Sequence, residues 1–120
     1  MSVFPIYERG LDNTEAVDAA AIPVERATGP LLLISGGDDR MWPAARMCTM
    51  AMERLARCGR TNSGRHLNYA DAGHVLVPRR HAPSTVPHMP MMFDLGGSPG
   101  ATTAAHADAW PQVVAHLCHG

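Results

Sequence analysis

Leu31-Leu32-Leu33-Ile34-Ser35-Gly36-Gly37-Asp38-Asp39 is a short apolar run that ends in two glycines and two aspartates. The pair Gly29-Pro30 stands directly before it and separates it from the preceding chain. An apolar run bounded in this way predicts a strand over Leu31 to Ser35 that is buried on both faces. Strands buried on both faces are typical of parallel sheets, so the run favours an α/β fold.

A helix and a second strand are predicted after this run. Apolar residues recur at helical spacing between Pro43 and Gly59, which indicates a helix over residues 44–57 with proline at its start and glycine past its end. The stretch His66 to Tyr69 is predicted as the next strand. Strand, helix and strand at this spacing predict a βαβ unit, whose right-handed crossover puts the carboxyl ends of both strands at one edge of the sheet.

Asp39 and His74 each follow one of these strands, so we expect them side by side at that edge, where open α/β sheets bind ligands. A carboxylate at a strand end can orient a histidine by accepting its Nδ1–H. The remaining histidines are expected to be solvated or partly packed: His66, His81, His88, His106, His116 and His119. We therefore predict Asp39 as the orienting acid and His74 as the base, while Asp38 accepts backbone N–H groups of its turn.

No nucleophile for this pair is found in the sequence. α/β-Hydrolases order their catalytic residues as serine, acid and histidine, and no serine elbow precedes Asp39. The stretch Gly96-Gly97-Ser98-Pro99-Gly100 matches the Gly-x-Ser-x-Gly pattern, but it follows the histidine, and Pro99 lacks the N–H that an oxyanion hole needs. Ser98 is better interpreted as a turn or helix-start residue, and neither Ser2 nor Ser35 stands in an elbow.

The rest of the chain gives weaker signals. Thr14 is predicted to cap a short helix that runs to Ala21. Residues 78–100 have no stable period and are predicted as a long loop or lid, whose methionines pack onto the body or contact an acyl chain. Residues 101–117 are predicted as an amphipathic helix on the sheet, in which Pro111 displaces the start or causes a kink. Its expected packing face consists of Trp110, Val113, Val114 and Leu117.

Composition excludes several classes of function. The 120 residues carry a formal net charge of −1 without a run of Lys or Arg, so nucleic acid and anionic membranes are not expected partners. The apolar runs are far shorter than the roughly 20 residues of a membrane-spanning helix, and no secretory signal is visible. The cysteines are three in number and form no Cys-x-x-Cys motif. We therefore expect a cytoplasmic chain without a cofactor, a zinc site or a disulfide framework.

Several stretches together resemble a known family. In chain order they are Ile22 to Arg26 with Gly29-Pro30, Leu31 to Pro43, Tyr69 to His74, and Gly96 through Trp110. Their order and spacing are similar to the C-terminal domain of the acyl-CoA thioesterase and bile acid-CoA:amino acid N-acyltransferase family, a group of α/β-hydrolases. The resemblance implies that a Ser or Cys attacks an acyl-CoA thioester, with Asp39 as triad acid and His74 as base. The sequence departs from the family at Arg79 and Pro111.

The resemblance also implies how the chain is organised. It indicates a poorly defined N-terminal segment, residues 1–20, followed by the C-terminal part of an α/β-hydrolase fold, residues 21–120, with an incomplete sheet. Because the family's nucleophile lies in an upstream half, we expect this chain to be inactive alone and to take an acyl-CoA or similar thioester when completed.

Two alternatives stay open. One is a non-catalytic remnant or binding domain for an acyl ligand or a partner chain, including a second copy, held at the open sheet edge. The other is a different α/β-hydrolase, such as a dienelactone hydrolase or a peptidase.

Overall fold

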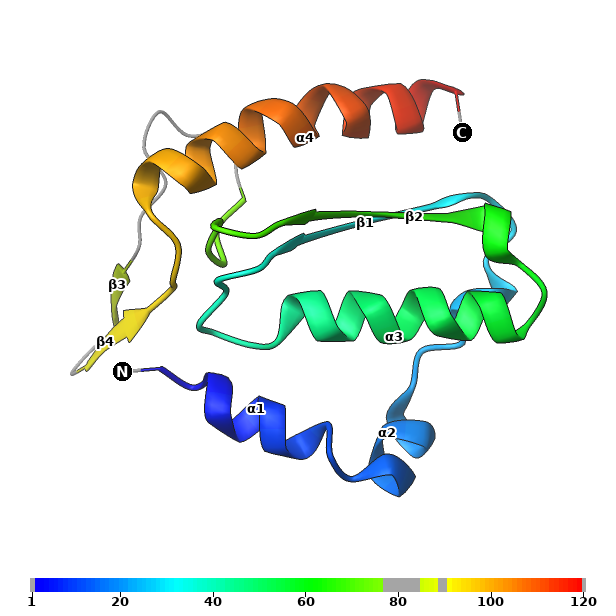
Figure 1. Cartoon of the computed structure of the whole chain (residues 1–120), viewed down its shortest axis with the longest axis horizontal. Coiled ribbons are helices and arrows are strands. Elements are labelled where there is room, and N and C mark those ends of the chain that lie inside the picture. Colours follow the sequence, from blue (N-terminus) through cyan, green and yellow to red (C-terminus); the bar gives the residue numbers. More distant parts are fainter. Residues whose placement is uncertain (1, 77–84, 89–90, 120) are drawn as a thin grey trace.

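A two-stranded parallel sheet lies between two helices, α3 on one face and α4 on the other (Figure 1). The computed structural model describes residues 2–76, 85–88 and 91–119. Strand β1 (Leu31–Gly36) leads through α3 (Ala44–Arg57) and a 3-10 turn, η2 (Thr61–Ser63), to β2 (Gly64–Tyr69). The register pairs Leu31 with Gly64 and Gly36 with Tyr69. The predicted α/β class and parallel βαβ unit are therefore confirmed.

Helix α3 begins and ends where the sequence predicted. Pro43 occupies the N-cap, and Gly59 follows the helix with a φ of 72°. The N–H groups of Gly59 and Arg60 donate to the carbonyl oxygens of Ala56 and Leu55, at 3.0 and 2.8 Å. This pattern is a Schellman motif, which needs a left-handed residue after the helix, and glycine adopts that conformation without strain.

The N-terminal segment contains a helix that the sequence did not predict. Helix α1 (Phe4–Gly10) is followed by α2 (Thr14–Ala20) and by the 3-10 turn η1 (Val24–Arg26). The cap of α2 is Asn13, whose side chain accepts the Ala16 N–H at 3.1 Å, so the prediction that Thr14 caps this helix was wrong by one residue.

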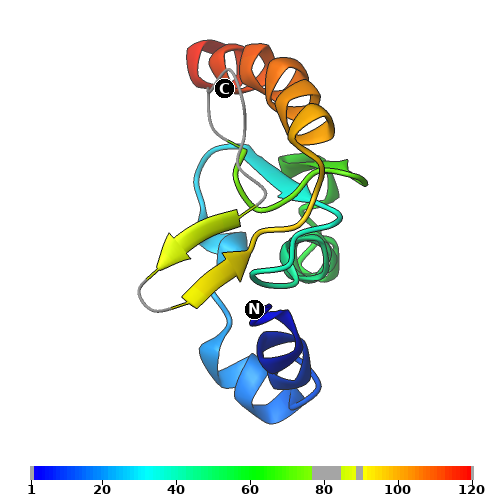
Figure 2. The ribbon, with the colours of Figure 1, turned by 90° about the vertical axis from the view of Figure 1, so that its left-hand side faces the viewer.

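The segment that was predicted as a long loop contains a β-hairpin in its described part. Strands β3 (Thr85–His88) and β4 (Met91–Asp94) pair antiparallel (Figure 2). The register places Val86 opposite Phe93. Pro87 lies within β3, and proline is tolerated in edge strands because it removes only one donor from the ladder. The sequence also predicted that methionines of this segment contact the body or an acyl chain. One of them, Met89, lies outside the described residues.

Helix α4 (Pro99–His119) packs on the sheet through a different face from the predicted one. Thr102, Ala105 and Ala109 are its buried residues, whereas Trp110, Val114 and Leu117 are exposed. The helix also starts ahead of residue 101 and continues through Pro111, so Pro111 does not displace its start. Small side chains let the helix backbone approach the strands, and the larger apolar side chains point elsewhere.

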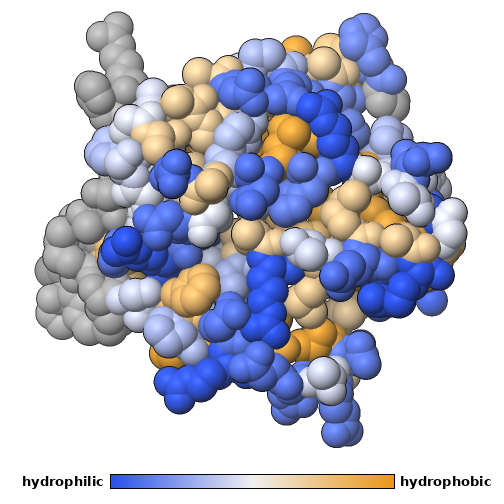
Figure 3. All heavy atoms as spheres, viewed as in Figure 1, coloured by the Kyte–Doolittle hydropathy of each residue, from blue (hydrophilic) through white to orange (hydrophobic). Residues whose placement is uncertain are grey.

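Few large side chains are fully buried in the described structure. Leu55 is the main one, and the other buried apolar residues are Ala72, Leu95, Ala105 and Ala109. The side chains of Leu31 to Ile34 remain partly exposed, so the prediction that β1 is buried on both faces was wrong. On the face drawn in Figure 3, apolar residues are visible at separate places among polar ones. The side chains of β1 are partly exposed because, among the described residues, this strand has a neighbouring strand on only one side.

Candidate functional site

The loops after β1 and β2 meet at the carboxyl edge of the sheet. The N–H of Gly37 donates to the carbonyl of Tyr69 at 2.8 Å, and the N–H of Asp38 donates to that of Ala72 at 3.0 Å. A Cβ at Gly36 or Gly37 would collide with the backbone of residues 70–73. The two glycines therefore allow the loops to touch, which brings Asp39 and His74 together.

Asp39 is buried, with 6% of its surface exposed, and both of its carboxylate oxygens are used. Oδ1 accepts the backbone N–H groups of Met41 and Trp42 at 2.8 and 3.2 Å. Oδ2 lies 3.0 Å from Nδ1 of His74. The two backbone donors fix the plane of the carboxylate, so its second oxygen has a defined position for the imidazole.

His74 is held at both its backbone and its ring. Its N–H donates to the carbonyl of Leu95 at 2.8 Å, and its side chain is 24% exposed. A carboxylate can only accept, so the bond to Asp39 requires a proton on Nδ1, and in the neutral ring Nε2 then carries a lone pair. No described residue hydrogen bonds to Nε2. The arrangement can accept a proton from a group that approaches Nε2.

The turn at Gly96 and Gly97 holds the two loops against the start of α4. Both glycines have positive φ, 69° and 65°, and a Cβ on either would overlap the backbone of Asp38 or Gly73. Asp38 accepts the Gly97 N–H at 2.9 Å, so the backbone N–H that it accepts belongs to a distant segment and not, as predicted, to its own turn. This bond and the neighbouring Arg40 guanidinium hold the pKa of Asp38 below its ordinary value. The Gly-Gly-Ser-Pro stretch is thus part of the site's framework.

Arg40 joins the same framework from the surface. Its guanidinium forms ion pairs with Asp38 and Asp94, both at 3.1 Å. Asp94 also accepts the Gly96 N–H at 3.0 Å, and this bond, more than the ion pair, lowers its pKa. The signal that could have identified this cluster is the Gly-Gly pair, because two successive glycines indicate positive φ or a close backbone approach.

The serines considered from the sequence have structural contacts. The side chain of Ser98 accepts the Ala101 N–H at 3.1 Å, which confirms it as a helix-start residue. Ser2 donates to the Arg40 carbonyl at 2.7 Å. Ser35 is only 2% exposed, and its Oγ lies 2.7 Å from Nε2 of His66. Sequence reasoning did not identify this pair, in which Ser35 is buried and His66 is half-buried. Burial lowers the pKa of His66.

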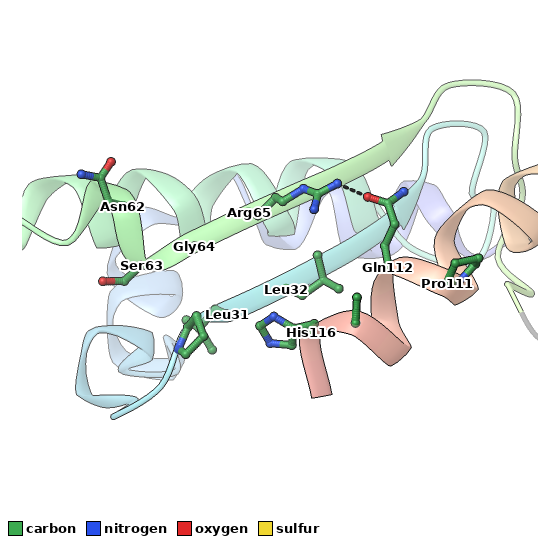
Figure 4. A pocket seen from close by; sticks show the side chains of 11 residues that line it. Leu31, Leu32, Asn62, Ser63, Gly64, Arg65, Pro111, Gln112 and His116 are labelled. Carbon is green, nitrogen blue, oxygen red and sulfur yellow. Dashed lines mark hydrogen bonds between the residues drawn. The ribbon is translucent and has the colours of Figure 1, made fainter. Parts of the chain in front are cut away.

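A cavity of about 420 Å³ lies at the opposite end of the sheet (Figure 4). It opens between the start of both strands and the C-terminal half of α4, and Arg65 donates to Gln112 across it. Its lining contains neither Asp39 nor His74. In the part of the chain that the structure describes, no cluster of His, Cys, Asp or Glu side chains suits a metal ion. No described helix is long and apolar enough to cross a bilayer.

Comparison with known proteins gives a consistent result. A sequence model of the family described as "BAAT / Acyl-CoA thioester hydrolase C terminal" matches residues 4–119. The chain is 36% identical over 98 residues to acyl-coenzyme A amino acid N-acyltransferase 2 of Rattus norvegicus, a match that covers 77% of this chain and 22% of that protein. It is 32% identical over 95 residues to human acyl-coenzyme A thioesterase 6, with the same coverage of the two chains.

A third relative is the peroxisomal succinyl-coenzyme A thioesterase of Mus musculus, which is 30% identical over 104 residues. That match covers 78% of this chain and 23% of the relative. The chain therefore spans less than a quarter of the length of these relatives. Because this relative is named for the peroxisome, the cytoplasmic location expected from the sequence stays a prediction.

Proposed function

Because this chain belongs to the family of the BAAT and acyl-CoA thioester hydrolase C-terminal domain, we propose that it supplies the acid and the base of an enzyme that cleaves acyl-CoA thioesters. Asp39 is the orienting acid and His74 the base. The observation that carries the proposal is the 3.0 Å contact between Oδ2 of Asp39 and Nδ1 of His74, at the edge of the sheet where α/β proteins bind ligands. The names of the relatives support the thioester as substrate.

The proposed chemistry uses Nε2 of His74 twice. It first takes the proton of a serine or cysteine nucleophile, which attacks the thioester carbonyl and forms an acyl-enzyme, and it then gives this proton to the departing CoA sulfur. Next it takes a proton from water or an amine, which attacks the acyl-enzyme, and it returns this proton to the serine or cysteine as the acid or amide is released. Asp39 keeps the imidazole in the required tautomer and stabilises the imidazolium of each step.

The nucleophile belongs, in this proposal, to an upstream part of the α/β-hydrolase fold. No described hydroxyl or thiol bonds to Nε2 of His74, and the relatives are more than four times as long as the matched segment. Such a part would cover the side of β1 that has no described neighbouring strand, together with the exposed Trp110, Val114 and Leu117 on α4. We therefore propose that the chain alone is inactive.

The decisive test is a chimera in which this chain replaces the matching segment of human acyl-coenzyme A thioesterase 6. Thiol release from acyl-CoA is followed with a thiol reagent. Asp39→Asn is expected to lower kcat about 10³- to 10⁴-fold, because the amide favours the wrong imidazole tautomer. His74→Ala should have a similar effect, and Asp71→Asn is the matched control because Asp71 is an exposed carboxylate of the same loop. Unchanged thiol release by the His74→Ala chimera would refute the proposed role.

Two measurements on the chain alone complete the test. The chain should release no thiol from acyl-CoA, and turnover that disappears on His74→Ala would show that it holds a nucleophile of its own. Its solution mass tells whether the free edge of β1 pairs with a second copy. A well-behaved monomer would argue against dependence on a further segment.

A further inference from the structure

Trp42 contacts both members of the Asp39–His74 pair, and the proposed chemistry gives it no role. Its backbone N–H donates to Oδ1 of Asp39 at 3.2 Å. Its indole ring stands nearly perpendicular to the imidazole of His74, at an interplanar angle of 84° and a centroid distance of 4.7 Å. The indole is 41% exposed. Burial of apolar surface is therefore only part of what this side chain contributes.

The bond between Asp39 and His74 does not by itself fix the orientation of the imidazole ring. One hydrogen bond at Nδ1 does not lock the ring, because the imidazole can still turn about its Cβ–Cγ bond. Such a turn carries Nε2 away from its direction and breaks the bond to Asp39 that keeps the proton on Nδ1. The edge-to-face contact with the indole at this distance is favourable, and the imidazole loses this contact when it turns to another orientation. The indole thus restricts the direction in which Nε2 points.

The indole is itself supported from the N-terminal segment. The ring of Tyr7 on α1 packs on Trp42 at 6.0 Å and 89°. Helix α1 is in turn held to α3 by Arg46, whose guanidinium bonds to Glu8 at 2.7 Å and to Asp12 at 3.0 Å. A chain of contacts therefore runs from α1 through Tyr7 and Trp42 to the imidazole.

We propose that Trp42 is a positioning residue for His74, and that Tyr7 on α1 holds the indole in place for this purpose. The consequence for the reaction rests on the proposed function, since the direction of Nε2 matters when His74 is the base. The effect on the imidazole itself does not depend on that role. It can be measured in this chain without a nucleophile.

The experiment is ¹⁵N NMR of the imidazole nitrogens in the histidine-labelled chain. Wild type is expected to show one dominant tautomer of His74, with the proton on Nδ1. In Trp42→Leu, which keeps an apolar side chain of good size, the minor tautomer should rise about three- to tenfold, the range that an aromatic pair of ordinary strength supports. Trp42→Phe, which keeps an aromatic ring, should have the wild-type tautomer ratio. Tyr7→Ala should raise the minor tautomer of His74 by less than Trp42→Leu does.

Trp110→Leu is the matched control, because Trp110 lies beside another histidine, His106, at 5.9 Å. It should change the signals of His106 and leave those of His74 as they are. The proposal is overturned if Trp42→Leu, with its amide spectrum otherwise intact, keeps the wild-type tautomer ratio of His74, or if Trp42→Phe fails to restore that ratio. Failure of the proposed function would be seen elsewhere, as undiminished thiol release by the His74→Ala chimera.

Discussion

Gly97→Ala tests the framework that joins the Asp39 and His74 loops to α4. An alanine at a φ of 65° costs about 1–2 kcal/mol, because its Cβ crowds the following carbonyl. The added Cβ would also overlap the backbone N of Gly73 and come within 2.7 Å of Oγ1 of Thr102. The Gly73 N–H donates to that same oxygen at 3.0 Å, and losing this buried bond costs about 1–3 kcal/mol. The expected sum is about 2–5 kcal/mol of unfolding free energy.

The assay is urea unfolding of the chain, with Gly100→Ala as the matched control. Gly100 lies in the first turn of α4 without a positive φ, and a Cβ there would meet nothing within 4 Å. Alanine at that position should stabilise the chain by about 0.5–1 kcal/mol, because glycine is a poor helix residue. The reasoning is refuted if Gly97→Ala unfolds within about 0.5 kcal/mol of wild type, or if both substitutions destabilise equally.

A double-mutant cycle identifies the bond that is lost. Thr102→Val removes the hydroxyl acceptor at nearly constant volume and should cost about 1–3 kcal/mol by itself. If Gly97→Ala acts partly by breaking the Gly73–Thr102 bond, the double variant should cost less than the sum of the two single variants. Strict additivity would mean that the backbone adjusts around the new methyl group with this bond intact.

Three further predictions concern groups away from the site. The hydrogen bonds from Arg54 lower the pKa of Glu25 from 4.5 to about 2, which stabilises the wild-type fold by an amount that is lost as the pH falls from 4.5 to 2. Arg54→Met should raise this pKa toward 4.5 in an NMR titration. The variant should also lack this pH-dependent part of the wild-type stability. Burial and a 2.6 Å hydrogen bond to Asp108 raise the pKa of Tyr69 to about 12. Asp108→Asn should lower this pKa toward 10 in an ultraviolet titration. An unchanged pKa would mean that burial is the sole cause. Pro111→Ala restores a backbone donor inside α4 and should raise the unfolding free energy by about 1–3 kcal/mol, so an unchanged thermal midpoint would contradict it.

The parts of the fold that the sequence predicted are those with a local cause. Helix α3 lies where the sequence predicted a helix, from about residue 44 to 57, because Pro43 and Gly59 mark its ends and its apolar spacing is regular. The closeness of Asp39 and His74 follows from a topological rule, since parallel strands joined by a right-handed crossover end at the same edge. Their catalytic roles stay predictions.

The parts that were missed depend on contacts between distant segments. Hydropathy points to Trp110 and Leu117 as the packing face of α4, yet the sheet accepts Ala105 and Ala109, because small side chains allow close approach of the helix. Asp38 accepts the N–H of Gly97. The Gly-Gly pair indicates a close backbone approach, but no local pattern shows which segment it approaches. Helix α1 has a proline in its first turn but buries no residue. Because it has no buried face, its sequence lacks the apolar periodicity that would have predicted a helix.

The described contacts that hold the Asp39–His74 pair come from neighbouring residues of this chain. The carboxylate is fixed by the N–H groups of Met41 and Trp42, and the backbone of His74 is fixed by the carbonyl of Leu95. None of these contacts needs a nucleophile or a further strand. Under the proposed function, an upstream segment therefore has to bring its nucleophile to Nε2, because the carboxylate of Asp39 and the backbone of His74 are already held by the loops that meet at Gly36, Gly73 and Gly97.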